Sequence, residues 1–351
     1  MAKRIVIMAG GTGGHVFPAL AVAQLLAEKG WQISWLGTQK GLESRVIPEH
    51  GIEIDWLSVA GVRGKGLPSK IAAVFKLLKA CVQAGAILRR RKPDVVLGMG
   101  GFVAGPGGLM AKLLGIPLVI HEQNRVPGTT NRLLARMAKQ VLEAFPGSFK
   151  PAVHAQCTGN PLRKQFLNRP GAGGKAAGQA VNILVVGGSQ GAQILNEVVP
   201  EAAAQLSGIR IKHQSGAAML AQVTERYKAL GVNAEVSAFF DDMVAAYQWA
   251  DMVICRAGAM TVSEVAAIGI PAIFIPLPGA IDDHQTANAK YLTDAGAGML
   301  LMQKDLNAST LAAHITEAIH HLDALGEAAK QCARLDATEA VADVCIAEAG
   351  L

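Results

Sequence analysis

The chain has 351 residues and a formal net charge of +6, which favours anionic partners such as nucleotide phosphates, anionic lipid or nucleic acid. The uncharged stretch at residues 95–111 contains six glycines and a proline, which excludes a membrane-spanning helix there. The five cysteines lack metal-ligand spacing, so we expect buried thiols in a reducing compartment. Hydrophobic residues make up 51% and aromatic residues only 5%, with 39 glycines, which is typical of α/β proteins with buried parallel strands.

One local pattern occurs twice along the chain. An apolar run at 4–9 ends in a glycine-rich loop at 10–14, and a helical pattern follows it. A second apolar run at 181–186 ends in the loop 187–192, again followed by a helical pattern. Two strand–loop–helix openings predict two Rossmann-like domains in tandem.

Further apolar runs alternate with helical patterns, which is typical of parallel sheets. They predict strands at 33–36, 94–98, 117–120, 153–157, 209–213, 251–255 and 271–275. Residues 168–180 are rich in Gly, Ala and Pro and are expected to form a surface loop or linker. We therefore predict an N-terminal domain over 1–160 and a C-terminal domain over 161–336. The last helix, about 337–351, is free to pack back on the first domain.

Three glycine loops, at 10–14, 98–101 and 187–191, are candidates for anion binding. Glycine lets the backbone approach a ligand closely, and a following helix offers free N–H groups and its positive dipole end. No loop is a GxxxxGK[ST] phosphate loop and none follows G-x-G-x-x-G strictly, which disfavours a nicotinamide cofactor. For any single loop, a tight turn that only packs strand on helix is the simpler alternative.

The segment 256–264 follows a predicted strand and opens a helix. Thr261 and Glu264 have the spacing of a capping box, so a capped helix start is one interpretation. The other is that Glu264 accepts hydrogen bonds from ribose hydroxyls while Arg256 faces phosphate. The next polar segment, 276–289, is either a ligand-binding strand end or an exposed loop, and the chain holds no D-x-D triplet for a metal.

Polar residues also follow a strand in the N-terminal half. His121, Glu122, Gln123 and Asn124 come directly after 118–120, where burial without partners would be costly. A functional site or a solvated loop would explain them. His15, after the first glycine loop, is a candidate general base, although a single histidine at a helix start is more often structural.

From Trp56 to Pro93 the chain contains nine Lys and Arg residues and no Asp or Glu. Within this segment Ile71, Val74, Phe75, Leu78 and Val82 share one helical face, whereas Lys76, Lys79 and Gln83 lie on another. A basic amphipathic helix suits an anionic membrane surface. A helix that faces the core and is solvated on its basic side is the alternative.

Six segments together closely resemble one family: GGTGGHVFP (10–18), GMGGFVAGPGG (98–108), HEQN (121–124), GNPLR (159–163), GGSQGA (187–192) and RAGAMTVSE (256–264). This is the MurG family, the bacterial transferases that join N-acetylglucosamine from UDP-N-acetylglucosamine (UDP-GlcNAc) to lipid I, undecaprenyl-pyrophosphoryl-MurNAc-pentapeptide, to make lipid II. The resemblance implies the GT-B fold, two Rossmann-like α/β domains with parallel sheets facing across a cleft that holds the UDP-sugar. It also implies an inverting transfer to the muramyl C4 hydroxyl that forms a β-1,4 linkage, without metal or cofactor.

The resemblance further implies a role for each matching residue. The substrate-binding set would be Thr12, Gly13, Gly14, Asn124, Arg163, Ser189, Phe240, Ala259, Met260, Thr261, Val262, Ser263, Glu264 and Gln285. In this set Ser189 would face the phosphates, Glu264 the ribose and the segment near Phe240 the uracil, while Gln285 would bind the sugar hydroxyls. Gly10, Gly11, Gly100 and Gly101 would bind the acceptor pyrophosphate, and His15 is the family's candidate base. The segment 63–92 would bind the anionic inner membrane at its cytoplasmic face.

Two other classes of function remain open at this stage. A GT-B enzyme of another kind, such as a UDP-sugar epimerase, shares the fold. A non-catalytic protein that binds nucleotides or nucleic acid would fit the positive charge, but the chain contains no recognisable nucleic-acid motif and we expect no nucleic-acid partner.

Overall fold

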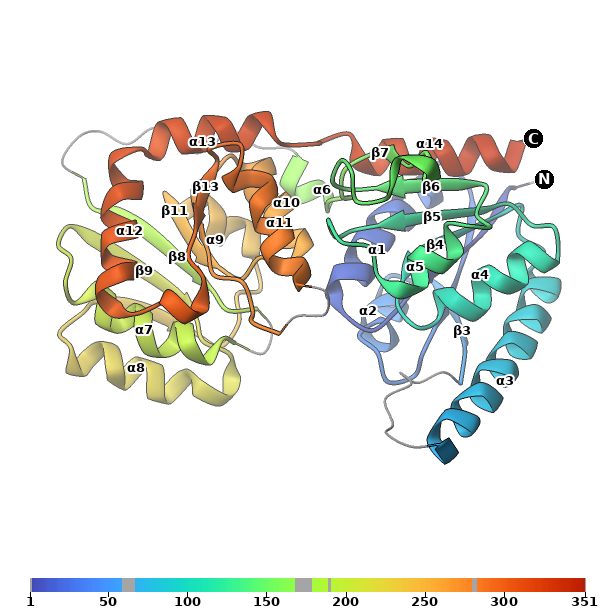
Figure 1. The fold of residues 1–351 in the computed structure, drawn as a ribbon, viewed down its shortest axis with the longest axis horizontal. Coiled ribbons are helices and arrows are strands. Elements are labelled where there is room, and N and C mark those ends of the chain that lie inside the picture. The colour runs from blue at the N-terminus through green and yellow to red at the C-terminus, as the bar shows by residue number, and fades with distance from the viewer. Residues whose placement is uncertain (1, 59–66, 168–178, 189–190, 280–282, 351) are drawn as a thin grey trace. The chain divides into compact units, whose positions relative to one another are not determined.

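The computed structural model describes residues 2–58, 67–167, 179–188, 191–279 and 283–350, with 67–73 described for the backbone only. The chain divides into two compact units (Figure 1). Unit 1 consists of Met1–Arg163 with Arg334–Leu351, and unit 2 of Lys164–Ala333.

A seven-stranded sheet in the order β3-β2-β1-β4-β5-β6-β7 forms the centre of unit 1, and every strand pairing in it is parallel. The strands are β1 (Arg4–Ala9), β2 (Gln32–Gly37), β3 (Glu53–Trp56), β4 (Val95–Gly100), β5 (Leu118–Glu122), β6 (Gln140–Glu143) and β7 (Gln156–Cys157). The strand order reverses between β1 and β4. Ligands of open α/β sheets bind at the carboxyl ends of the strands beside such a switch point.

Helices cover both faces of this sheet (Figure 1). They are α1 (Gly13–Glu28), α2 (Glu43–Glu49), α3 (Leu67–Arg91), α4 (Ala104–Leu113), α5 (Thr129–Leu134) and α14 (Ala337–Gly350), with a 3₁₀ turn η1 (Pro151–Val153). Because successive strand residues point to opposite faces, Ile5 and Ile7 pack with α1 and α14, whereas Val6 and Met8 pack with α3 and α4. The C-terminal helix α14 is therefore part of the core of unit 1.

Unit 2 repeats the architecture around a six-stranded parallel sheet in the order β10-β9-β8-β11-β12-β13. Its strands are β8 (Val181–Val186), β9 (Ile209–Gln214), β10 (Ala234–Ser237), β11 (Met252–Cys255), β12 (Ala272–Phe274) and β13 (Gly298–Leu300). Its helices are α6 (Lys164–Leu167), α7 (Gln193–Ala203), α8 (Leu220–Ala229), α9 (Met243–Trp249), α10 (Ala259–Ile268), α11 (His284–Thr293), α12 (Ala308–His320) and α13 (Leu322–Gln331), with 3₁₀ turns η2 (Ala217–Met219) and η4 (Gln303–Asp305). The switch point lies between β8 and β11.

The predicted class, α/β with two parallel sheets, is confirmed. The strand predicted at 153–157 is wrong over most of its length. The 3₁₀ turn η1 and His154, which has a left-handed φ of 53°, occupy its first part, and only Gln156–Cys157 is strand. The strands β3, β6, β10 and β13 are not among the predicted strands, and pairing with neighbouring strands defines each of them.

The prediction of buried thiols is confirmed for two of the five cysteines. Cys255 and Cys345 are buried thiols as expected, but Cys81, Cys157 and Cys332 are only half-buried. Among the residues that the structure describes, no helix is both long enough and apolar enough to cross a bilayer.

Candidate active site

Two glycine-bearing turns meet at the switch point of unit 1. Gly98 and Gly100 lie inside β4 rather than in a loop, and the register of β4 against β1 shifts so that Met8 pairs with Gly98 and Ala9 with Gly100. A Cβ at Gly101 would lie 2.4 Å from the carbonyl oxygen of Gly10, and both Gly100 and Gly101 have positive φ. No side chain fits at either position, so close backbone approach explains these glycines.

His15 lies in this contact. A Cβ at Gly100 would lie 2.8 Å from His15 Nδ1, so the imidazole packs directly on the β4 backbone. Its Nδ1 is 2.7 Å from Gln123 Oε1, at the end of the neighbouring strand β5. The ring is half-exposed. The fold thus brings His15, Gly100 and Gln123 together from three separate segments.

The polar residues after 118–120 do not form a solvated loop. His121 and Glu122 belong to β5, and His121, Glu122 and Gln123 are at most 2% exposed. Glu122 accepts hydrogen bonds from the backbone N–H and the side-chain amide of Asn124, from Gly128 N–H and from Asn131 Nδ2. Burial is offset by these partners, so Glu122 shapes the turn that carries Asn124.

Glu43 is a site residue that the sequence gave no reason to select. It is fully buried at the start of α2 and accepts hydrogen bonds from Gly11 N–H (2.9 Å), Thr38 N–H (2.9 Å) and Thr38 Oγ1 (2.7 Å). The Gly11 amide is therefore occupied by a carboxylate. Thr12 is the N-cap of α1, and Gly13 and Gly14 begin the helix, where amides lack intrahelical partners and favour an anion.

Arg163 lies at the end of unit 1, with its guanidinium carbon 5.4 Å from the centre of the Phe17 ring. Phe17 belongs to the first turns of α1. A cation over an aromatic face is attracted by the ring. This contact holds the charge of Arg163 close to the start of α1.

A cavity of about 710 Å³ lies at the switch point of unit 2. Gly187, Gly188 and Gly191 line it after β8, together with the first residues of α7. Gly258 and Thr261 line it from the start of α10, and Gln285 lines it from α11. Two helix N-termini therefore face one cavity of the size that small-molecule ligands occupy, an arrangement that suits a diphosphate. Ser189 lies outside the described residues.

Arg256 also lines this cavity, but it is already engaged. It donates to the carbonyl oxygens of Ile275 (2.9 Å) and Pro276 (3.1 Å) and to Gln303 Oε1 (2.9 Å). Burial lowers the pKa of its guanidinium. Arg256 thus braces the segment after β12 and contributes positive charge at the cavity wall. Gln303, from η4, was not selected from the sequence.

The capping-box interpretation of Thr261 and Glu264 is wrong. The N-cap of α10 is Gly258, without a side-chain cap, so Thr261 and Glu264 lie within the helix. Glu264 is half-buried, and the Tyr247 hydroxyl is 3.5 Å from its Oε2. As far as the described residues define the cavity, its lining does not include the following predicted residues: Phe240, Ala259, Met260, Val262, Ser263 and Glu264.

Gln285 and the remaining predicted residues of α10 have defined contacts. Gln285 Oε1 accepts from Leu277 N–H at 2.9 Å, which ties α11 to the loop after β12. Val262 is fully buried, and Ser263 Oγ donates to the Ala259 carbonyl. In the part of the chain that the structure describes, no group of three or more His, Cys, Asp or Glu side chains is arranged to hold a metal ion.

Comparison with known proteins relates both units to one family. Residues 5–143 match the glycosyltransferase family 28 N-terminal domain, and residues 182–344 match the glycosyltransferase family 28 C-terminal domain. A protein of Methylococcus capsulatus is 58% identical over the full length of both chains. One of Shewanella oneidensis is 51% identical, over 98% of this chain and 97% of its own. Both are named UDP-N-acetylglucosamine--N-acetylmuramyl-(pentapeptide) pyrophosphoryl-undecaprenol N-acetylglucosamine transferase.

Solved structures agree with this relationship. The crystal structure of Acinetobacter baumannii MurG matches with a TM-score of 0.87 and 42% identity, over 98% of this chain and 99% of that one. UDP-GlcNAc 2-epimerase from Neisseria meningitidis matches with a TM-score of 0.67 at 12% identity, over 99% and 100% of the two chains, which shows a shared fold alone. The GT-B class predicted from the sequence is confirmed.

Replacing Glu43 by Gln tests its role in holding the first glycine loop. The amide would turn an NH₂ group toward N–H donors, and we expect unfolding free energy to fall by about 1–3 kcal/mol. Denaturant unfolding followed by circular dichroism measures this change. Glu49→Gln, at the exposed end of the same helix, is the matched control. Equal stability of both variants would contradict the role of Glu43.

Proposed function

The chain belongs to glycosyltransferase family 28, and we propose on that basis that it transfers N-acetylglucosamine from UDP-GlcNAc to the muramyl C4 hydroxyl of lipid I, giving lipid II in peptidoglycan synthesis. The full-length identity of 58% to a relative named for this reaction is the observation that carries the proposal. The pair of switch points supports it, because the reaction needs two diphosphate sites, one for UDP and one for the lipid carrier.

The donor UDP-GlcNAc is assigned to the cavity of unit 2. The start of α10 and the loop 187–191 take the diphosphate, and Ser189 belongs to that loop. Gln285 uses its side-chain amide for the sugar hydroxyls, since its oxygen already holds Leu277 N–H. By family resemblance, Glu264 takes the ribose and Phe240 the uracil, with backbone contacts from 259–263. These assignments stay predictions.

The acceptor pyrophosphate is assigned to unit 1. Gly13 and Gly14, at the start of α1, offer the amides that Gly11 cannot, and Gly10, Gly100 and Gly101 form the adjoining backbone wall. By resemblance, Thr12, Gly13, Gly14, Asn124 and Arg163 also contribute to donor binding from this unit. Arg163 is placed near α1 by its contact with Phe17.

The chemistry is a single in-line displacement. His15 takes the proton of the C4 hydroxyl, the oxygen forms its bond to the anomeric carbon, and the carbon–oxygen bond to UDP breaks with its electron pair leaving on the diphosphate. Helix N-termini and the charge of Arg256 stabilise that leaving group. No step requires a metal ion.

The decisive experiment is transfer of radiolabelled N-acetylglucosamine to a short-chain lipid I analogue. Product should form in the presence of both substrates, and activity should survive excess EDTA after metal removal. Incubation with UDP-GlcNAc alone separates the second candidate, because an epimerase would change the nucleotide sugar without an acceptor. An absence of transfer, or a requirement for added Mg²⁺, would refute the corresponding part of the proposal.

His15→Ala should lower kcat by about 10²–10⁴-fold, because a well-placed general base contributes that much to proton transfer. Affinity for UDP-GlcNAc should be unchanged, since unit 2 holds the donor. Steady-state kinetics and calorimetric titration with UDP measure the two effects. A variant within a few-fold of the wild-type kcat would show that His15 is not the base.

We also propose that unit 1 docks on the anionic cytoplasmic face of the inner membrane through α3 and α4. Val74, Phe75, Leu78 and Val82 on α3 are 56–73% exposed, so the alternative of a core-facing apolar side fails for these residues. Leu113 on α4, which packs beside α3, is also exposed. Exposed apolar side chains gathered on neighbouring helices mark an interaction surface.

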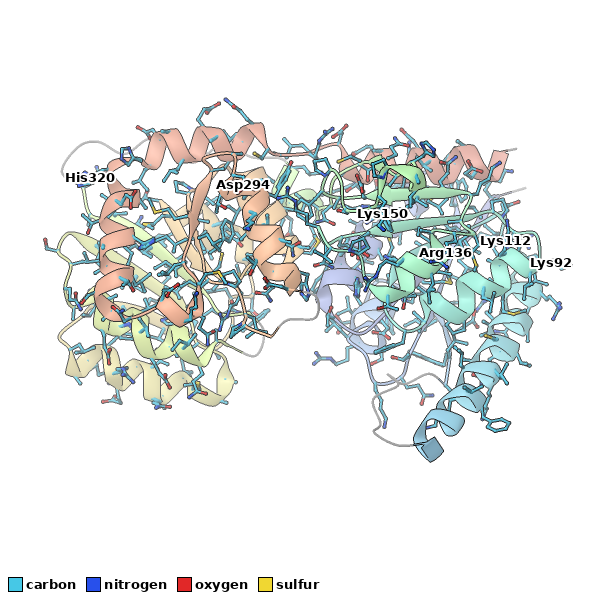
Figure 2. All side chains as sticks on the ribbon, in the orientation of Figure 1. Lys92, Lys112, Arg136, Lys150, Asp294 and His320 are labelled. Atoms are coloured by element: carbon cyan, nitrogen blue, oxygen red, sulfur yellow. The ribbon has the colours of Figure 1, made fainter. Side chains whose placement is uncertain are left out.

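Exposed basic residues lie on the same two helices and just after α3 and α5. Lys76 and Lys79 are exposed on α3 itself. Lys112 on α4, and Lys92 and Arg136 just after α3 and α5, are also exposed (Figure 2). An exposed apolar helix face that also carries basic residues suits a bilayer that contains anionic lipids, which is where an undecaprenyl-linked acceptor resides.

Reversing charge at Lys76 and Lys79 together to Glu should weaken binding to vesicles containing phosphatidylglycerol by at least about 10-fold, because each Lys near an anionic surface contributes about 1 kcal/mol. UDP affinity should stay constant. Lys228→Glu with Lys290→Glu, both exposed on unit 2, changes the net charge equally and should have a smaller effect. Vesicle co-sedimentation measures binding, and equal loss in both double variants would contradict docking through α3.

A further inference from the structure

A chain of side-chain hydrogen bonds runs through the carboxyl ends of the unit 1 strands to His15. It begins at the carbonyl oxygen of Gly159, which lies 2.8 Å from His121 Nε2. His121 Nδ1 lies 3.0 Å from Gln123 Nε2, and Gln123 Oε1 lies 2.7 Å from His15 Nδ1. His121 and Gln123 are buried, whereas His15 is half-exposed. The chain thus leads from the interior to the surface.

The donor and acceptor of each hydrogen bond in this chain follow from the Gly159 carbonyl oxygen at its start. A carbonyl oxygen only accepts, so His121 must donate from Nε2. Burial lowers the pKa of His121 to about 4, although the Gly159 carbonyl and the Glu122 charge favour its protonated form. Near neutral pH the ring is therefore uncharged. Its Nδ1 holds a lone pair and accepts from the Gln123 amide.

The orientation of the Gln123 amide has independent support. Its Nε2 also lies 3.2 Å from the carbonyl oxygen of His121. If the amide were turned over, its oxygen would face that carbonyl oxygen and the His121 lone pair, two acceptors, with no proton between them. Gln123 Oε1 must then point at His15, where it can only accept.

On this basis, and given the proposed transferase function, we propose that His121 and Gln123 are positioning residues that fix the proton of His15 on Nδ1 and leave the Nε2 lone pair for the acceptor hydroxyl. Neither touches the substrate. Gly100 completes the arrangement, because a residue without a side chain lets the His15 ring lie against β4. This packing restricts rotation of the ring. In the transfer step the hydroxyl proton moves to Nε2, and the resulting imidazolium keeps its Nδ1–H bond to Gln123.

The tautomer of His15 can be measured without any substrate. Long-range ¹H–¹⁵N correlation spectra of protein labelled in its nine histidines distinguish protonation at Nδ1 from protonation at Nε2. The signals are assigned by loss in His15→Gln and His121→Gln. At about pH 7.5 we expect His15 in the Nδ1–H form and His121 in the Nε2–H form. His15 protonated on Nε2, or exchanging between both forms, would overturn the proposal even if Gln123 variants fail to fold.

The variant Gln123→Met removes the acceptor and retains an unbranched side chain of similar length. We expect His15 to lose its single tautomer, kcat to fall about 10- to 100-fold, and the KM for UDP-GlcNAc to stay within about twofold. Gln24→Met is the matched control, because Gln24 on α1 also bonds a histidine, His50, at 3.3 Å. It should retain the His15 tautomer and wild-type kcat.

These measurements separate the two proposals. A wild-type enzyme that transfers sugar while His15 carries its proton on Nε2 would refute the positioning role and leave the transferase function standing. A fixed Nδ1–H tautomer in a protein that transfers no sugar would refute the function instead. A Gln123→Met variant with unaltered tautomer and kcat would also refute the positioning role.

Discussion

The contact between the first glycine loop and the end of β4 is the constraint on which the arrangement around His15 depends. At Gly101 a Cβ would lie 2.4 Å from the carbonyl oxygen of Gly10, closer than non-bonded atoms approach. The shifted register between β1 and β4 brings the two turns to this distance. A bulge of this kind redirects the chain beside a site. The bulge places Gly100 against the His15 ring, and the Nδ1 atom of that ring contacts Gln123 at the end of β5.

Two buried carboxylates, those of Glu43 and Glu122, stabilise the turns at this site by accepting hydrogen bonds. Glu43 takes the amide of Gly11, and Glu122 takes four donors from the turn after β5. Each of these two carboxylates is matched by several donors, which is the condition under which polar groups are buried at low cost. The same bonds decide which amides are left for a ligand. In unit 1 these are the amides at the start of α1, which is also where Arg163 contributes its charge.

The switch point of unit 2 is arranged differently. It is a cavity between the starts of α7 and α10. Arg256 braces the wall through two carbonyl oxygens and Gln303. One fold, used twice, therefore forms a cavity lined by two helix N-termini in unit 2 and a packed backbone turn that holds the His15 ring in unit 1. On α3 of unit 1, Val74, Phe75, Leu78 and Val82 form an exposed apolar face, whereas Ala84 and Leu88 further along the helix pack in the core.

The amino-acid pattern by itself determined the class of the fold and the positions of the central strands, because buried parallel strands are continuous apolar runs and glycine turns interrupt them at fixed places. It also determined the family, through motifs spread over the whole chain. It did not determine the short strands β3 and β13, which depend on pairing with neighbours. The predicted roles of Glu264 and Phe240 stay predictions. Only the tertiary structure decided that Glu43 lies under the first glycine loop, that Glu264 is inside a helix rather than capping it, and that Gln123 faces His15. Gly11 and Glu43 are 32 positions apart and His15 and Gln123 are 108 positions apart, so no local periodicity encodes these contacts.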